Sequence, residues 1–117
     1  MKAIRIDGFG GPEVLRLADA PDPSPAAGQI VARVEAAGLN FIDVYHRTGL
    51  YPNPLPLVPG MEGAGTVAAV GPGVTGWREG DRVLVHPIDR VKGGLMGETR
   101  DGGLAEYCAV AAHQLVH

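Results

Sequence analysis

Glycine and proline interrupt this chain so often that neither a long helix nor a long strand is expected. The 117 residues include 18 glycines and 10 prolines. Glycine supplies the positive φ that tight turns need, whereas proline ends helices and strand pairing. The short segments between them alternate apolar and polar residues, which is the pattern of half-buried strands. The sequence therefore predicts a mainly β domain, a small and partly open β-barrel with one or two short helices.

Six segments fit this strand pattern. They are residues 2–7, 14–18, 29–37, 65–70, 81–85 and 104–110. The clearest is 29–37, in which Ile30, Val34 and Ala36 fall on one face and Arg33 and Glu35 on the other. We therefore expect 29–37 to be a central strand with one face in the core.

Only one segment has the features of a helix. It runs from Phe41 to Thr48 and is followed by Gly49, a residue suited to end a helix. Four prolines between Pro52 and Pro59 exclude regular structure in the next segment.

Composition excludes several classes of partner. A net charge of -3 gives no reason to expect nucleic acid binding, and no apolar run is long enough to cross a membrane. Cys108 is the only cysteine, so a disulfide within the chain and a four-cysteine metal site are both impossible. The first residues lack the apolar core of a signal peptide. We expect one cytoplasmic domain, residues 1–117.

Five segments occur in the order known from one enzyme superfamily. They are Ala37 to Tyr45, Arg47 to Pro52, Pro59 to Gly65, Gly80 to Val83 and Gly103 to Tyr107. On these segments the whole chain resembles the GroES-like amino-terminal catalytic domain of medium-chain dehydrogenases and reductases. The first two are most similar to the zinc-free NADPH:quinone oxidoreductase branch, the zeta-crystallin-like proteins.

The resemblance implies an enzyme with a second domain, a Rossmann fold that carries NADPH. Residues 1–117 contain no Gly-x-Gly-x-x-Gly fingerprint between a strand and a helix, because Gly60, Gly63 and Gly65 have the reversed spacing. We therefore expect the cofactor domain after residue 117, and no activity from residues 1–117 alone.

The resemblance also bears on metal binding. Asn40 and Met61 stand where zinc alcohol dehydrogenases of the superfamily have a cysteine and a histidine, and both are poor zinc ligands. The lobe that holds a structural zinc in those enzymes is matched by a cysteine-free segment from His86 to Gly103. We expect no metal, and a zinc-type lobe reduced to a short loop.

Four residues are the candidate site. The resemblance implies that Asn40, Asp43 and Tyr45 contact the nicotinamide half of the cofactor, and that Tyr45 and Tyr51 line the substrate pocket as catalytic residues. A tyrosine offers a flat apolar ring with a hydroxyl tip, which suits a quinone. Alternatives stay open: Asn40 and Asp43 could only cap the helix, and Tyr45 could only pack on the barrel.

Four other residues are expected to be structural. Glu62 is predicted to be a buried acid paired with an arginine, and Cys108 an inert core thiol. His46 and Arg47 are predicted to form a solvated helix face.

The resulting hypothesis is an NADPH-dependent quinone or enone oxidoreductase that transfers hydride without zinc. Two other hypotheses stay open. One is a zinc-free alcohol dehydrogenase-like enzyme or an enoyl reductase, and the other is a free-standing GroES-like binding module, because a fold does not fix a function.

Overall fold

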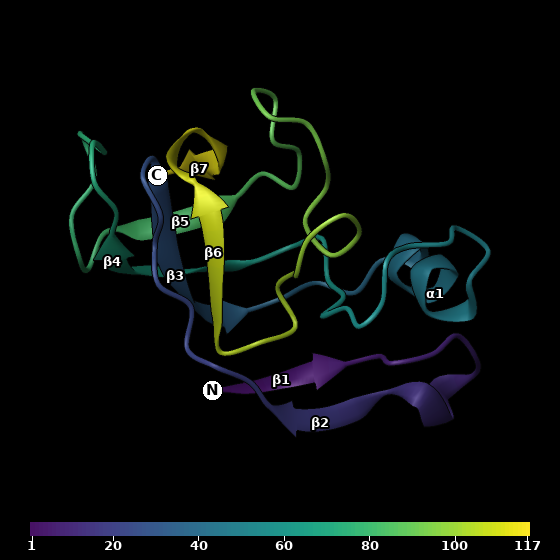
Figure 1. Cartoon of the computed structure of the whole chain (residues 1–117). Coiled ribbons are helices and arrows are strands. Elements are labelled where there is room, and N and C mark those ends of the chain that lie inside the picture. Colours follow the sequence, from purple (N-terminus) through teal and green to yellow (C-terminus); the bar gives the residue numbers. More distant parts are fainter.

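Two antiparallel sheets make up the fold in the computed structural model, which describes residues 1–117. The smaller sheet pairs β1 (Lys2–Arg5) with β2 (Arg16–Asp19), and the larger has the strand order β6-β3-β4-β5-β7 (Figure 1). The strands of the larger sheet are β3 (Gln29–Ala36), β4 (Ala64–Val70), β5 (Arg82–Val85), β6 (Tyr107–Ala111) and β7 (Leu115–Val116). The mainly β, partly open barrel is therefore confirmed.

Loop segments join the two sheets. The N–H of Ile4 donates to the carbonyl oxygen of Leu104 at 2.8 Å, and Ile6 and Leu57 exchange two backbone bonds of 2.9 and 3.0 Å. Ile6 therefore pairs outside β1, which is why this strand is shorter than the predicted 2–7. These bonds hold the β1–β2 hairpin against the segment around Leu57, before β4, and the segment around Leu104, before β6.

The core lies on one side of the larger sheet. Its nine buried residues are Ile30, Ala32, Val67, Val83, Val85, Met96, Cys108, Val110 and Leu115. The predicted alternation in β3 is wrong in part, because Ile30, Val31 and Ala32 are all buried and Ala36 is exposed. The register against β4 shifts between Val31 and Ala32, and such an irregularity changes which face a side chain joins.

Helix α1 (Phe41–Thr48) lies to one side of the larger sheet in Figure 1. It ends as predicted, because Gly49 has φ 83°, which is favoured only by glycine. The two other helices are short 3-10 turns, η1 (Pro12–Val14) and η2 (Ala112–Gln114). None of the helices has the length and apolar character needed to cross a bilayer.

Candidate functional site

Helix α1 buries two polar residues and exposes three apolar ones. Asp43 and His46 are 6% and 0% exposed, whereas Phe41 is 83%, Val44 41% and Tyr45 36% exposed. An ordinary surface helix has the opposite arrangement. Residues three or four positions apart share a helix face, so Phe41, Val44 and Tyr45 form one outward apolar stripe. We call it the α1 stripe. It marks a surface suited to a ligand or to another part of the protein.

Tyr51 extends the α1 stripe on the chain that follows the helix. Its ring is 48% exposed and lies edge-on to the ring of Tyr45, with centroids 5.4 Å apart and planes at 73°. The N–H of Tyr51 donates to the carbonyl oxygen of Tyr45 at 3.3 Å. The structure therefore brings together the two tyrosines predicted for the substrate pocket.

Asp43 makes one half of the predicted cap at the start of α1. The N–H of Asn40 donates to the Asp43 carboxylate at 2.9 Å, whereas the Asn40 side chain makes no capping bond and has another partner. That partner is Glu62, whose carboxylate accepts from the Asn40 carboxamide at 3.0 Å. The capping role is confirmed for the Asp43 side chain and not for that of Asn40, and the cofactor contact of both residues stays a prediction.

The prediction for Glu62 is wrong. This residue is exposed, and the side-chain hydrogen bond that it accepts comes from Asn40 rather than from an arginine. Its carboxylate lies against Gly38, where any side chain would collide with it. Because solvent reaches Glu62, the carboxylate needs no arginine to offset burial. A hollow of about 310 Å³ lies beside Glu62, between the ends of β3 and β5.

The prediction that His46 and Arg47 form a solvated face is also wrong. His46 is fully buried, and its Nε2 lies 2.9 Å from the carboxylate of Glu98. Arg47 is half-buried and donates to the carbonyl oxygen of Gly10 at 2.7 Å. The apolar residues of α1 face outward, so these polar residues face loops that supply the acceptors. Nothing in the sequence around Glu98 signals this contact.

Three buried side-chain atoms in the chain have no hydrogen-bond partner, and all lie between residues 43 and 53. They are Asp43 Oδ1, His46 Nδ1 and Asn53 Nδ2. Unsatisfied buried polar atoms are rare in native proteins and each needs an explanation, of which a functional role is one. Their position points to the same part of the fold as the α1 stripe.

The donor set beside Asn40 does not fit zinc. It consists of a carboxamide, the Glu62 carboxylate and the Met61 thioether, whereas zinc sites use thiolate, imidazole and carboxylate ligands in sets of three or four. No three histidine, cysteine, aspartate or glutamate side chains gather anywhere in the chain to hold an ion. We therefore derive no step through zinc.

A family model, the alcohol dehydrogenase GroES-like domain, matches residues 26–117. The chain belongs to this family. The domain is part of the medium-chain dehydrogenase/reductase superfamily, as the sequence predicted. We call residues 1–117 the GroES-like domain.

Curated relatives include both enzymes and a vesicle protein. A quinone oxidoreductase of Pseudomonas aeruginosa is 51% identical over 99% of the GroES-like domain and 33% of that protein. A synaptic vesicle membrane protein VAT-1 homolog of Rattus norvegicus is 48% identical over 73% of the domain and 22% of that protein. The domain thus spans about a fifth to a third of the length of these relatives.

Solved structures share the fold over nearly the whole domain. An NAD-dependent alcohol dehydrogenase has a TM-score of 0.93 and 38% identity, over 99% of the domain and 39% of that chain. A mycobacterial protein in complex with NADPH has a TM-score of 0.82 and 42% identity, over 99% of the domain and 33% of that chain. The GroES-like domain therefore has the fold of about a third to two fifths of each of these solved chains.

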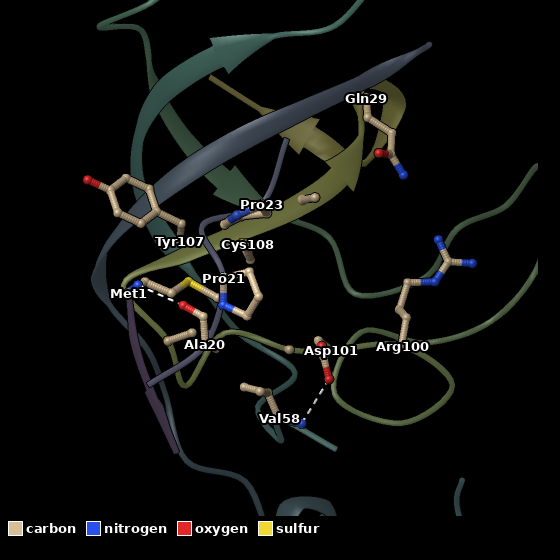
Figure 2. Close-up of a pocket in the computed structure, with 13 residues that line it drawn as sticks. Met1, Ala20, Pro21, Pro23, Gln29, Val58, Arg100, Asp101, Tyr107 and Cys108 are labelled. Carbon is tan, nitrogen blue, oxygen red and sulfur yellow. Dashed lines mark hydrogen bonds between the residues drawn. The ribbon is translucent and has the colours of Figure 1, made fainter. Parts of the chain in front are cut away.

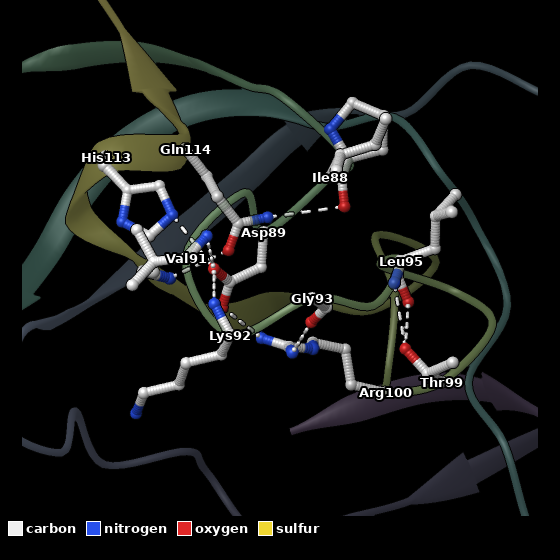
Figure 3. A network of polar contacts seen from close by, with 12 residues as sticks. Ile88, Asp89, Val91, Lys92, Gly93, Leu95, Thr99, Arg100, His113 and Gln114 are labelled. Atoms are coloured by element: carbon white, nitrogen blue, oxygen red, sulfur yellow. Dashed lines mark hydrogen bonds and ion pairs between the residues drawn. The ribbon is translucent and has the colours of Figure 1, made fainter.

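The loop expected to be a reduced lobe is organised by Asp89. This residue is 1% exposed, and its carboxylate accepts from the N–H groups of Val91 and Lys92 at 3.0 and 2.9 Å (Figure 3). Arg100 and His113 also bond to it, each at 3.0 Å. The Lys92 N–H holds the pKa of Asp89 well below its usual range, against burial, with help from Val91, Arg100 and His113. The carboxylate therefore fixes this loop to η2.

A larger hollow of about 410 Å³ opens between the β1–β2 hairpin and β6, and it does not include the α1 stripe (Figure 2). Two of its polar groups already have partners, since Asp101 accepts from the N–H of Val58 at 2.9 Å and the Met1 amine donates to Ala20 at 2.8 Å. Cys108 lines it but is only 3% exposed, and burial raises the pKa of its thiol to about 11. Such a thiol is unreactive at neutral pH, so we place the candidate site at α1.

Proposed function

We propose that the GroES-like domain forms the substrate side of an NADPH-dependent quinone or enone oxidoreductase that works in the cytoplasm and uses no metal. The α1 stripe with the Tyr45–Tyr51 pair is the observation that carries this proposal. Exposed aromatic and aliphatic side chains suit a flat apolar ring, and tyrosine hydroxyls suit its carbonyl oxygens. The name of the Pseudomonas aeruginosa relative supports the substrate class.

The proposal gives each site residue a role. Tyr45 and Tyr51 hold the ring of the substrate, and a hydroxyl donates a hydrogen bond to the oxygen on which negative charge develops. Asn40 and Asp43 seat the nicotinamide, with the Asn40 carboxamide offering a donor and an acceptor. When bound, NADPH supplies the hydride.

The proposed cofactor is NADPH. The mycobacterial structure in complex with NADPH supports a nicotinamide cofactor, and the resemblance favours NADPH over NADH. The groups that read the ribose lie in the Rossmann fold of such enzymes, and residues 1–117 contain no glycine fingerprint for one. We therefore propose that a domain beyond residue 117 carries most of the cofactor contacts.

One further observation favours a second function within the enzymes. The similarity to the NAD-dependent alcohol dehydrogenase, with a TM-score of 0.93, suits a zinc-free enzyme that acts on a substrate other than a quinone. The segment from His86 to Gly103, which we call the Asp89 loop, is consistent with this second function. Its two ends resemble the ends of the structural-zinc lobe in zinc alcohol dehydrogenases. The remaining hypothesis is a free-standing binding module, which would catalyse no reaction.

Turnover by the protein expressed from its natural reading frame tests the proposal. Quinones, enones and simple alcohols are compared with NADPH and NADP⁺. We expect quinone or enone reduction, with kcat about 100-fold lower in Tyr51→Phe if its hydroxyl is the donor to the developing charge. Oxidation of alcohols without quinone or enone reduction would refute the proposal in favour of the second function. No turnover of any of them would favour the binding module.

The isolated residues 1–117 provide a second test. We expect them to bind NADPH more weakly than micromolar by calorimetry and to turn over no substrate. Micromolar binding of NADPH by this polypeptide would contradict the proposal that a domain beyond residue 117 carries most of the cofactor contacts.

A further inference from the structure

His46 joins the candidate site to a distant loop. It lies on the inward face of α1, is fully buried, and bonds through Nε2 to the carboxylate of Glu98, 52 positions further along the chain. The Glu98 side chain is 28% exposed, so water reaches one end of the pair but not the imidazole. The pair is the side-chain contact that ties the inward face of α1 to the Asp89 loop.

Glu98 is itself held in place by the backbone around it. Its N–H donates to the carbonyl oxygen of Leu95 at 3.3 Å, and the N–H of Thr99 donates to the same oxygen at 3.1 Å. The Thr99 hydroxyl bonds to Leu95 as well, and Arg100 is bound to Asp89 (Figure 3). The backbone that carries the Glu98 carboxylate is therefore a hydrogen-bonded turn, tied to Leu95 on one side and through Arg100 to Asp89 on the other.

The two ring nitrogens of His46 have different surroundings. Nε2 lies 2.9 Å from the Glu98 carboxylate, which accepts a hydrogen bond when Nε2 carries the hydrogen. Nδ1 is left buried without a partner. An apolar side chain would fill this position without an unsatisfied atom, so packing alone does not account for a histidine. The histidine therefore has a use other than filling space.

The imidazole lies next to the substrate-side tyrosines. The ring centroids of His46 and Tyr51 are 6.3 Å apart, with planes at 57°, and Tyr51 in turn contacts Tyr45 edge-on. Tyr51 lies on a proline-rich segment without regular structure, so neighbouring side chains must define its orientation. A fixed imidazole beneath an exposed ring supplies such a neighbour.

We propose that His46 and Glu98 are a positioning pair that orients Tyr51, and through it Tyr45, for an aromatic carbonyl substrate. The pair touches no substrate itself. This inference rests on the proposed function for the identity of the ligand, but not for the orientation of the tyrosines. Without the pair, the Tyr51 ring would have to become ordered when the ligand binds. Ordering one side chain weakens binding by roughly two- to tenfold.

The test uses NMR of the protein expressed from its natural reading frame, with its tyrosine rings labelled. The three tyrosines of residues 1–117 are Tyr45, Tyr51 and Tyr107, and Tyr107 lies on β6 and serves as an internal control. The probe is duroquinone, which has no free ring position for addition of a thiol. His46→Leu removes the partner on the helix, and Glu98→Ala removes the partner on the loop. Glu98→Gln keeps an oxygen that can accept a hydrogen bond from Nε2–H.

We expect His46→Leu and Glu98→Ala to change the signals of Tyr51 and Tyr45, leave Tyr107 unchanged, and raise the Kd for duroquinone roughly two- to tenfold. Glu98→Gln should keep the wild-type signals. Thermal unfolding should show that each variant is folded. Unchanged Tyr51 signals in two folded variants would overturn the positioning role. Changed signals, with no response of the wild-type tyrosines to duroquinone, would refute the proposed function and leave the positioning role standing.

Discussion

The Asp43 carboxylate should stabilise the start of α1, and its removal measures by how much. In Asp43→Ala the N–H of Asn40 loses its acceptor at 2.9 Å. Loss of a capping contact costs about 1 kcal/mol, and loss of a negative charge in the first helical turn about 0.5 kcal/mol. We therefore expect the free energy of unfolding to fall by about 1.5 kcal/mol.

This loss converts into a measurable shift of the unfolding midpoint. At about 2.1 cal/mol/K per residue, the entropy of unfolding of 117 residues is about 0.25 kcal/mol/K. A loss of about 1.5 kcal/mol then lowers Tm by about 6 °C. Circular dichroism gives Tm, and urea unfolding followed by the fluorescence of Trp77 gives the free energy.

Two further variants separate the cap from other effects of Asp43. Asp43→Asn keeps an oxygen acceptor but loses the charge, so its Tm should lie between wild type and Asp43→Ala. Glu79→Ala removes an exposed carboxylate and should change stability by less than about 0.5 kcal/mol. An unchanged Tm in Asp43→Ala, with Asp43→Asn also unchanged, would refute the argument that this carboxylate stabilises α1 through the Asn40 N–H.

Two other predictions follow from the buried titratable groups. The pKa of Asp89 is lowered in the folded state, so its contribution to stability is present above the ordinary aspartate pKa of about 4 and is lost as the pH falls below it. Urea midpoints from pH 7 down to pH 2 should therefore converge for wild type and Asp89→Asn, and a constant difference between them would contradict the assignment. Burial raises the pKa of the Cys108 thiol to about 11, so a colorimetric disulfide reagent at pH 8 should react with it only after urea is added. Rapid reaction of the native chain would show that the hollow beside β6 exposes the thiol.

Local patterns determined the elements of this fold. Frequent glycine and proline predicted short strands, and the segment from Phe41 to Gly49 was correctly read as a helix with its cap and its end. These features depend on residues within a few positions of one another, so they are visible in the sequence. Strand β7 has only two residues, too few for any alternation, and exists because it pairs with β5.

The sequence of α1 did not show which of its faces is buried. Its polar and apolar stripes are both visible, and the ordinary expectation places the apolar stripe inside. The structure reverses this, because acceptors from distant loops, Glu98 and the carbonyl oxygen of Gly10, lie where His46 and Arg47 point. These contacts span 52 and 37 positions, so no local pattern encodes them.

The chain by itself determined the class of fold, the family resemblance and the four candidate site residues. Only the tertiary structure decided how they are arranged: Tyr45 beside Tyr51, Asn40 bonded to an exposed Glu62, and a buried His46 near the ring of Tyr51. The physical reason is that burial and pairing of a polar group depend on which distant segment covers it. The residue type determines which hydrogen bonds and contacts a side chain can make, and the tertiary structure determines which partner lies close enough to make them.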